Sequence, residues 1–299
     1  MLAPLYRRID GHVLLAGSAP DGDSIRFLPR DASALGELRR ARLLRTSPVN
    51  GSVQLRLEGI DAPELHYVSE AQPRGALARD ALLAWLGVGR VTYAADGVTI
   101  AHADPAGVPV TILADAVDPN GRVIAYLQRA DATPGASRKS AALPKRKRVD
   151  AEALAATANV ALLAAGHVYL LMYTSLPLLH RHVLRDVARG ARAKKLGVHS
   201  ADATERGFAV RGERALSPTG ALIFPKLFRR VVDFRRALVQ GFHGSFGAWL
   251  AGHGSHGAPS PDRVNVKHAA NILFASLVKE RAGRVSLTTD PTNLIFVEA

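Results

Sequence analysis

The chain has 299 residues, of which 47% are hydrophobic and 22% charged, and this balance excludes a wholly disordered chain and allows one or two folded domains. Its net charge of +13 favours a polyanionic partner, first nucleic acid and second an anionic membrane surface. The absence of cysteine excludes disulfides, thiolate metal sites and cysteine nucleophiles.

The first 17 residues contain Arg7, Arg8 and Asp10 and only a short apolar run at 13–16. This run is shorter than the apolar core of a signal peptide, and the longest apolar stretch elsewhere, 160–172, is shorter than the ~20 residues of a transmembrane helix. We therefore expect no transmembrane segment and, by default, a cytoplasmic protein. A mis-assigned start would hide a secretion signal.

Residues 1–206 are expected to be mainly β-strand with interspersed helices. Alternating or β-branched runs between Pro, Asp and Gly predict strands at 12–16, 24–27, 52–57, 109–116 and 122–127. Helical spacing of apolar residues predicts helices at 73–86, 150–165 and 178–195. The second of these helices begins with a cap at Asp150 and is followed by Gly166, which suits the position just after a helix.

A basic insertion at 130–149 interrupts this part of the chain. It combines Pro, Gly and Ser with the run Lys145-Arg146-Lys147-Arg148. We expect a mobile, solvated loop, because short basic runs recur by chance. A nuclear-localisation signal or a nucleic-acid-binding patch is the alternative.

Residues 207–299 are expected to form a second, smaller α/β module of unknown fold. An amphipathic basic helix is predicted within 222–239, a helix at 266–280, and a strand, an Asp-Pro turn and a strand over 284–297. The segment 241–257, rich in Gly and His, is expected to be a loop. Its histidines share no ligand spacing with a carboxylate, so a loop is favoured over a zinc or proton-shuttling site. These histidines are His243, His253 and His256.

Three short segments carry residues suited to phosphodiester chemistry: 21–24, 56–64 and 120–122. Asp23 and Asp61 lie at the edges of predicted strands and offer hard oxygen ligands to Ca²⁺ or Mg²⁺. A site with few protein ligands leaves room for a phosphate oxygen and an attacking water.

Three further residues complete the set. Glu64, three residues after Asp61, can accept a proton from that water. Arg56 and Arg122 each present a planar guanidinium that matches two phosphate oxygens and stabilises the extra charge of a pentacoordinate phosphorus. Each motif alone is also typical of a plain turn or a helix start, so the order and spacing carry the hypothesis of metal-assisted phosphodiester hydrolysis.

Over about residues 10–206 the chain resembles the staphylococcal nuclease (thermonuclease) family. The matching segments, in order, are DGDS, RLEGIDAPE, NGR, NVALLAAGHVY and LRDVARGARAKKLGVHS. The resemblance implies an α+β, mainly β fold: a five-stranded OB-type β-barrel with packed helices. It also implies Ca²⁺-dependent hydrolysis of DNA or RNA that leaves a 3′-phosphate.

The resemblance assigns roles by position. Asp23 and Asp61 match the metal ligands, and Asp21 matches an acid beside them, followed by Ser24 in place of the usual Thr. Glu64 matches the general base, and Arg56 and Arg122 match the two arginines that bind phosphate and act in catalysis. The chain departs from the pattern at Ala62 for an often-found Thr, at His199 for a common Trp, and in the longer insertion at 130–149.

Two other functions stay open. A catalytically weak or inactive chain of the same fold would bind or scaffold nucleic acid, although retention of every acid and arginine favours the enzyme. A basic membrane-surface protein has less support, because no basic amphipathic helix stands apart from the barrel pattern.

Overall fold

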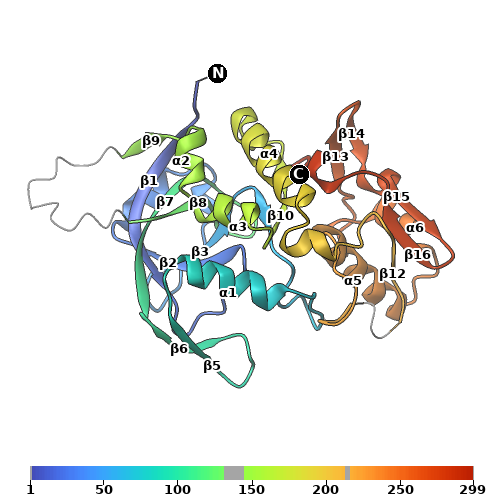
Figure 1. Ribbon diagram of the computed structural model, residues 1–299, viewed down its shortest axis with the longest axis horizontal. Helices are drawn as coiled ribbons and strands as arrows, with labels where there is room; N and C mark the ends of the chain where they lie inside the picture. Colours follow the sequence, from blue (N-terminus) through green and yellow to red (C-terminus); the bar gives the residue numbers. More distant parts are fainter. Residues whose placement is uncertain (1, 131–144, 213–215, 299) are drawn as a thin grey trace, which may run out of the picture. The chain divides into compact units, whose positions relative to one another are not determined.

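The computed structural model describes residues 2–130, 145–212 and 216–298 (Figure 1). Internal contacts divide the chain into two compact units. Unit 1 comprises Met1–Glu58 and Arg79–Leu162, and unit 2 comprises Gly59–Ala78 and Leu163–Ala299. The predicted domain boundary between residues 206 and 207 stays a prediction. Most of the predicted basic loop, 131–144, lies outside the described residues.

Unit 1 is built on a closed five-stranded β-barrel of mixed strand direction, which confirms the predicted OB-like barrel. Its strands are β1 (Leu5–Leu14), β2 (Ser24–Pro29), β3 (Val53–Leu57), β7 (Gly107–Val117) and β8 (Val123–Arg129). The order is β2-β3-β8-β7-β1, the β1–β2 pair closes the barrel, and β3–β8 is the parallel pair.

Alternation of side chains explains the barrel interior. Ile25 and Phe27 of β2 and Leu55 and Leu57 of β3 are buried, while their neighbours along each strand are partly exposed. Successive residues of a strand face opposite sides, so these apolar residues fill the interior. Each fully buried side chain of this size contributes roughly 1.5–3 kcal/mol.

Other elements of unit 1 surround the barrel. They are η1 (Ala32–Glu37), η2 (Ala41–Leu43), the hairpin β5 (Arg90–Tyr93) and β6 (Ile100–Asp104), β9 (Arg146–Arg148) and α2 (Ala151–Ala155). Two helices cross the division between the units: α1 (Gly75–Trp85) and α3 (Ala158–Ala164). Asp150 caps α2 as predicted, accepting from the backbone N–H of Ala153 at 2.9 Å. The single helix predicted at 150–165 is divided into α2 and α3. Between them, the hydroxyl of Thr157 donates to the carbonyl of Leu154 and accepts from the N–H of Val160.

The described end of the predicted basic loop is a strand. β9 pairs antiparallel with β1, with Lys147 opposite Tyr6 and Arg146 opposite Arg7. β2 covers β1 only from Gly11 to Leu14, so the first residues of β1 offer an open edge that β9 completes.

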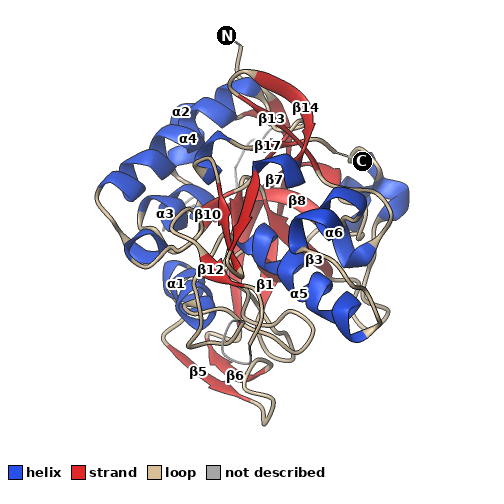
Figure 2. Ribbon diagram, turned by 90° about the vertical axis from the view of Figure 1, so that its right-hand side faces the viewer, coloured by secondary structure: helices blue, strands red, loops and turns tan. Residues whose placement is uncertain are grey.

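Unit 2 packs helices and small sheets around an aromatic core. Its helices are α4 (Leu178–Ala193), α5 (Pro225–Val239) and α6 (Phe246–Gly252), with η3 (Gly197–Ser200), η4 (Ser255–Gly257), η5 (Phe274–Leu277) and η6 (Pro291–Asn293). Figure 2 shows α5 beside α6. The core includes Phe224, Phe228, Phe234, Trp249 and Phe296. Within the part of the chain that the structure describes, no helix has the length and apolar character needed to cross a bilayer.

Three sheets lie in unit 2. One has the order β11-β17-β13-β14, another β12-β16-β15, and β4 pairs with β10. Their strands are β4 (Ile60–Asp61), β10 (Tyr169–Leu170), β11 (Met172–Tyr173), β12 (Phe208–Ala209), β13 (Arg263–Val266), β14 (Ala269–Leu273), β15 (Val278–Arg281), β16 (Arg284–Leu287) and β17 (Ile295–Phe296). The predicted strands within 284–297 are present as β16 and β17, and they join different sheets.

The predicted helix at 266–280 is wrong: the segment forms β14, η5 and β15. Its backbone hydrogen bonds go to β13 and β16, and Asn271 has a φ of 55°, which an α-helix does not allow. The predicted loop at 241–257 contains α6, capped by Ser245. α6 buries Phe246, Trp249 and Leu250 at helical spacing, a pattern hidden by the surrounding glycines.

Candidate active site

The β2–β3 pair of unit 1 brings Asp23 and Arg56 together. The register places Ser24 opposite Arg56, and the backbone N–H of Leu57 donates to the carbonyl of Asp23 at 2.8 Å. Arg56 Nη1 forms an ion pair with Asp23 Oδ2, and both side chains are largely buried. The guanidinium therefore balances the charge of this carboxylate within the barrel unit.

Asp21 shapes the turn that precedes this pair. Its Oδ1 accepts from the N–H of Gly22 at 2.6 Å, and its own N–H donates to the carbonyl of Ser24 at 2.9 Å. An Asp side chain that bonds its following backbone stabilises a tight turn. The turn delivers Asp23 directly to the start of β2.

Arg122 is held by Asp118 in the turn between β7 and β8. Asp118 Oδ1 accepts from the N–H groups of Asn120 and Arg122 at 2.9 Å, and Arg122 Nε donates to Asp118 Oδ2 at 2.8 Å. Gly121 has a φ of 83°, and a Cβ there would lie 2.7 Å from the carbonyl oxygen of Leu43. The turn thus requires glycine at this position.

Strand register places Arg122 and Arg56 on the same face of the sheet. Arg56 lies opposite Ile124 in the parallel β3–β8 pair, and Arg122 is two residues before Ile124. Residues two apart along an extended chain face the same side, so Arg122, just before β8, is expected on the face of the sheet that carries Arg56.

In unit 2, the segment after β4 presents Asp61 and Glu64. Asp61 is fully buried and lies opposite Tyr169 in the β4–β10 pair. Gly59, just before β4, has a φ of 78°, and its Cβ would lie 2.4 Å from Leu184 Cδ1. This close approach to α4 requires the glycine of the motif.

The segment is also fixed by Gln72, which the sequence analysis did not single out. Gln72 Oε1 accepts from the N–H of Glu64 at 3.1 Å, and its Nε2 donates to the carbonyl of Ile223 at 2.7 Å. The side chain is buried, so each of these bonds replaces a lost bond to water. A lone Gln in a polar stretch carries no pattern that would predict this role.

Arg229 of α5 pairs with both carboxylates of this segment. Its Nη2 lies 2.9 Å from Asp61 Oδ2, and its Nη1 lies 3.2 Å from Asp61 Oδ1 and donates also to Glu64 Oε1. Burial alone would lower the pKa of Arg229, but the charges of Asp61 and Glu64 outweigh it and hold that pKa well above its ordinary value. The guanidinium stays charged at every physiological pH.

Further contacts tie the same segment to α5. Tyr67 Oη donates to Asp233 Oδ1 at 3.1 Å, and Arg235 Nη1 lies 3.7 Å from Glu70 Oε1. Burial and the neighbouring Asp233 carboxylate raise the pKa of Tyr67. His256, one of the histidines in the Gly/His segment, stacks on Tyr67 with 5.7 Å between ring centroids.

The carboxylates of unit 2 suit a hard cation. Asp61 and Glu64 are close enough that one guanidinium nitrogen contacts both, and carboxylate oxygens are the ligands that Ca²⁺ prefers. Among the described residues, no group of three or more His, Cys, Asp and Glu side chains is arranged to hold a metal. In this structure both carboxylates of the pair contact the Arg229 guanidinium.

Comparison with models of known protein families finds none that matches the chain, and comparison with curated proteins finds no match either. What the geometry establishes is the five-stranded barrel with its Asp23–Arg56 pair and Arg122 in unit 1, and the Asp61–Glu64–Arg229 cluster in unit 2.

Proposed function

We propose that the chain is a Ca²⁺-dependent nuclease that hydrolyses phosphodiester bonds of DNA, RNA or both. The observation that carries the proposal is that Asp61, the proposed metal ligand, and Glu64, the proposed base, are buried carboxylates that contact the same guanidinium nitrogen of Arg229. The OB-like barrel and the ordered motifs that resemble the thermonuclease family support the same function.

Each residue has a distinct role in the proposal. Asp23 and Asp61 would hold Ca²⁺, which would supply positive charge to the scissile phosphate. Glu64 would accept a proton from the attacking water, whose oxygen bonds to phosphorus while the bond to the 5′-oxygen breaks and that oxygen takes a proton from solvent water. Arg56 and Arg122 bind the phosphate oxygens through their planar guanidiniums.

Arg229 sets how readily the carboxylates take a divalent ion. The oxygens that would bind the ion accept hydrogen bonds from its guanidinium, so Arg229 must release them first. Arg229→Gln should lower the concentration of Ca²⁺, or of luminescent Tb³⁺, that half-saturates the protein. Arg236→Gln, which removes the same charge from an exposed position of α5, should leave it unchanged. Equal half-saturation in all three proteins would exclude this competition.

The activity is tested by digestion of supercoiled plasmid and single-stranded RNA with Ca²⁺, Mg²⁺ or EDTA. We expect cleavage in Ca²⁺, none in EDTA, and a loss of about 100-fold or more in Glu64→Gln and in Arg56→Ala. Arg56→Lys keeps a positive charge beside Asp23 but lacks the planar guanidinium that bonds two phosphate oxygens. Arg236→Gln serves as the active control. Parent-like rates for Glu64→Gln and Arg56→Ala at saturating Ca²⁺ would show that the assigned roles are wrong.

A nucleic-acid-binding module without catalysis is the second candidate. The ion pairs Arg56–Asp23 and Arg229–Asp61 favour it, because they neutralise the carboxylates by means of the chain's own side chains. Salt-sensitive binding of DNA or RNA with no cleavage in any divalent ion would establish this function instead.

A further inference from the structure

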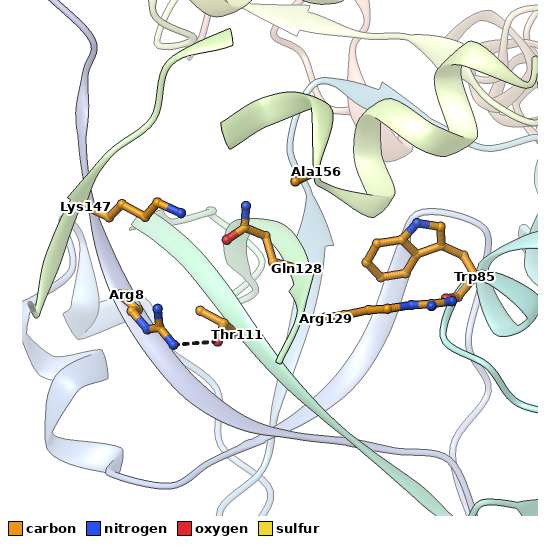
Figure 3. Close-up of a pocket in the computed structure, with 7 residues that line it drawn as sticks. All are labelled: Arg8, Trp85, Thr111, Gln128, Arg129, Lys147 and Ala156. Carbon is orange, nitrogen blue, oxygen red and sulfur yellow. Dashed lines mark hydrogen bonds between the residues drawn. The ribbon is translucent and has the colours of Figure 1, made fainter. Parts of the chain in front are cut away.

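Unit 1 contains a pocket of about 560 Å³ whose lining includes none of the residues proposed for catalysis (Figure 3). Strands β1, β7, β8 and β9 and helix α1 supply its walls. The side chains that matter are Arg8, Trp85, Thr111, Gln128, Arg129 and Lys147.

One end of the pocket is polar and positively charged. Lys147 lies opposite Tyr6 in the β9–β1 pair, and Arg8 is two residues after Tyr6 on β1, so both cations face the same side of the sheet. Arg8 Nη2 donates to Thr111 Oγ1 at 3.4 Å. In Figure 3 the ammonium of Lys147 and the amide of Gln128 point toward one another across the pocket.

The charge at this end exceeds its local compensation. Arg8 Nε pairs with Asp10 Oδ1 at 3.2 Å, and Asp10 also accepts from Thr111 Oγ1 at 2.6 Å. Among the described residues, no carboxylate forms an ion pair with Lys147 or Arg129. Among the described residues, Lys147 is therefore the cation of this end that no carboxylate pairs with, and Arg129 is its counterpart at the other end.

The other end carries a flat aromatic wall. The guanidinium carbon of Arg129 lies 5.2 Å from the centroid of the Trp85 ring, and Arg129 Nη2 donates to the Trp85 carbonyl. Figure 3 shows the guanidinium running beneath the indole. A stacked indole and guanidinium is a surface on which a nucleobase packs well.

We propose that this pocket binds a nucleotide, with the phosphate between Arg8 and Lys147 and the base against Trp85 and Arg129. The volume lies within the roughly 300–1,000 Å³ of small-molecule sites and is far larger than a phosphate ion needs. Gln128 Oε1 adds a hydrogen-bond acceptor, since Gln128 Nε2 already donates to the carbonyl of Ala153 at 2.9 Å. The basic run at 145–148 thus contributes one residue, Lys147, to a defined site.

The nucleotide is either free or one unit of a single strand, and titration distinguishes the two sources. Adenosine 5′-monophosphate, a short oligothymidine, adenosine and inorganic phosphate are added separately in EDTA, with Trp85 fluorescence as the signal. We expect the monophosphate, the oligothymidine or both to bind with a Kd at or below about 1 mM, and adenosine and phosphate to bind at least about tenfold more weakly. No saturable nucleotide binding, or phosphate alone binding as tightly as the nucleotide, would overturn the proposal.

Variants of one strand supply the matched control. Lys147→Ala should weaken nucleotide binding about tenfold or more, and Arg8→Gln likewise. Arg146→Ala removes the same charge from the neighbouring position, which faces the other side of β9, and should leave affinity within about twofold. Equal losses in Lys147→Ala and Arg146→Ala would indicate only a general basic surface. The proposal does not depend on nuclease activity, so either can fail alone.

Discussion

Replacing Arg229 by glutamine should strongly destabilise unit 2 when no divalent ion is present. The substitution removes the guanidinium that forms ion pairs with both Asp61 and Glu64. Asp61 has no exposed side-chain surface, so water cannot replace the lost partner there.

The expected loss in the free energy of unfolding follows from the burial of the ion pairs that Arg229 forms. Removing one partner of a buried ion pair costs about 3–5 kcal/mol, because a charge is left uncompensated. The side chains of Arg229 and Glu64 are 20% and 11% exposed, which favours the lower end, about 3 kcal/mol. Such a loss changes the ratio of folded to unfolded protein by about 100-fold. A cation that binds Asp61 and Glu64 in the variant, present at 100 times its Kd, should restore about 2.7 kcal/mol.

Urea unfolding measures this effect in the core of unit 2. Trp249 is buried there, so its fluorescence reports on unit 2 in a Trp85→Phe background. Arg229→Gln should unfold at lower urea in EDTA and recover in Ca²⁺, while Arg236→Gln should change the free energy of unfolding by less than about 0.5 kcal/mol. A loss below about 1 kcal/mol in Arg229→Gln, or an equal loss in Arg236→Gln, would refute the reasoning.

Three further predictions concern stability. Gln72→Ala should cost about 1–3 kcal/mol, because the buried N–H of Glu64 and the carbonyl of Ile223 lose their partner; an unchanged urea midpoint would contradict it. Gly59→Ala should cost about 1–3 kcal/mol through its positive φ and the clash with Leu184, whereas Gly36→Ala, with open space around it, should not. Burial in the folded protein lowers the pKa of His199 below its ordinary value of 6.5. As the pH falls through 6.5, the unfolded chain takes up the proton before the folded protein does. The stability that depends on neutral His199 is therefore present above pH 6.5 and is lost as the pH falls below it. His199→Gln should therefore reduce the loss of stability on acidification, and identical pH profiles would disprove the assignment.

Local sequence patterns determined much of this protein. Alternating apolar residues defined the barrel strands, because apolar residues must recur at every second position of a strand that buries one face. Asp150 and Gly166 marked helix ends through local backbone bonds and a positive φ. The motif segments also act locally: Asp21, Asp118 and Gly121 shape their own turns.

Only tertiary structure decided the rest. β9 exists because β2 leaves part of β1 uncovered, and the segment 266–280 forms strands because β13 and β16 accept its backbone hydrogen bonds. Arg229 is separated from Asp61 and Glu64 by 168 and 165 positions in the chain. The sequence predicts a basic amphipathic helix, whose arginines must each be hydrated or paired with an acidic side chain. Which acidic side chains pair with Arg229 is decided by the packing of α5 against the segment after β4, because the strength of an ion pair depends on distance in space.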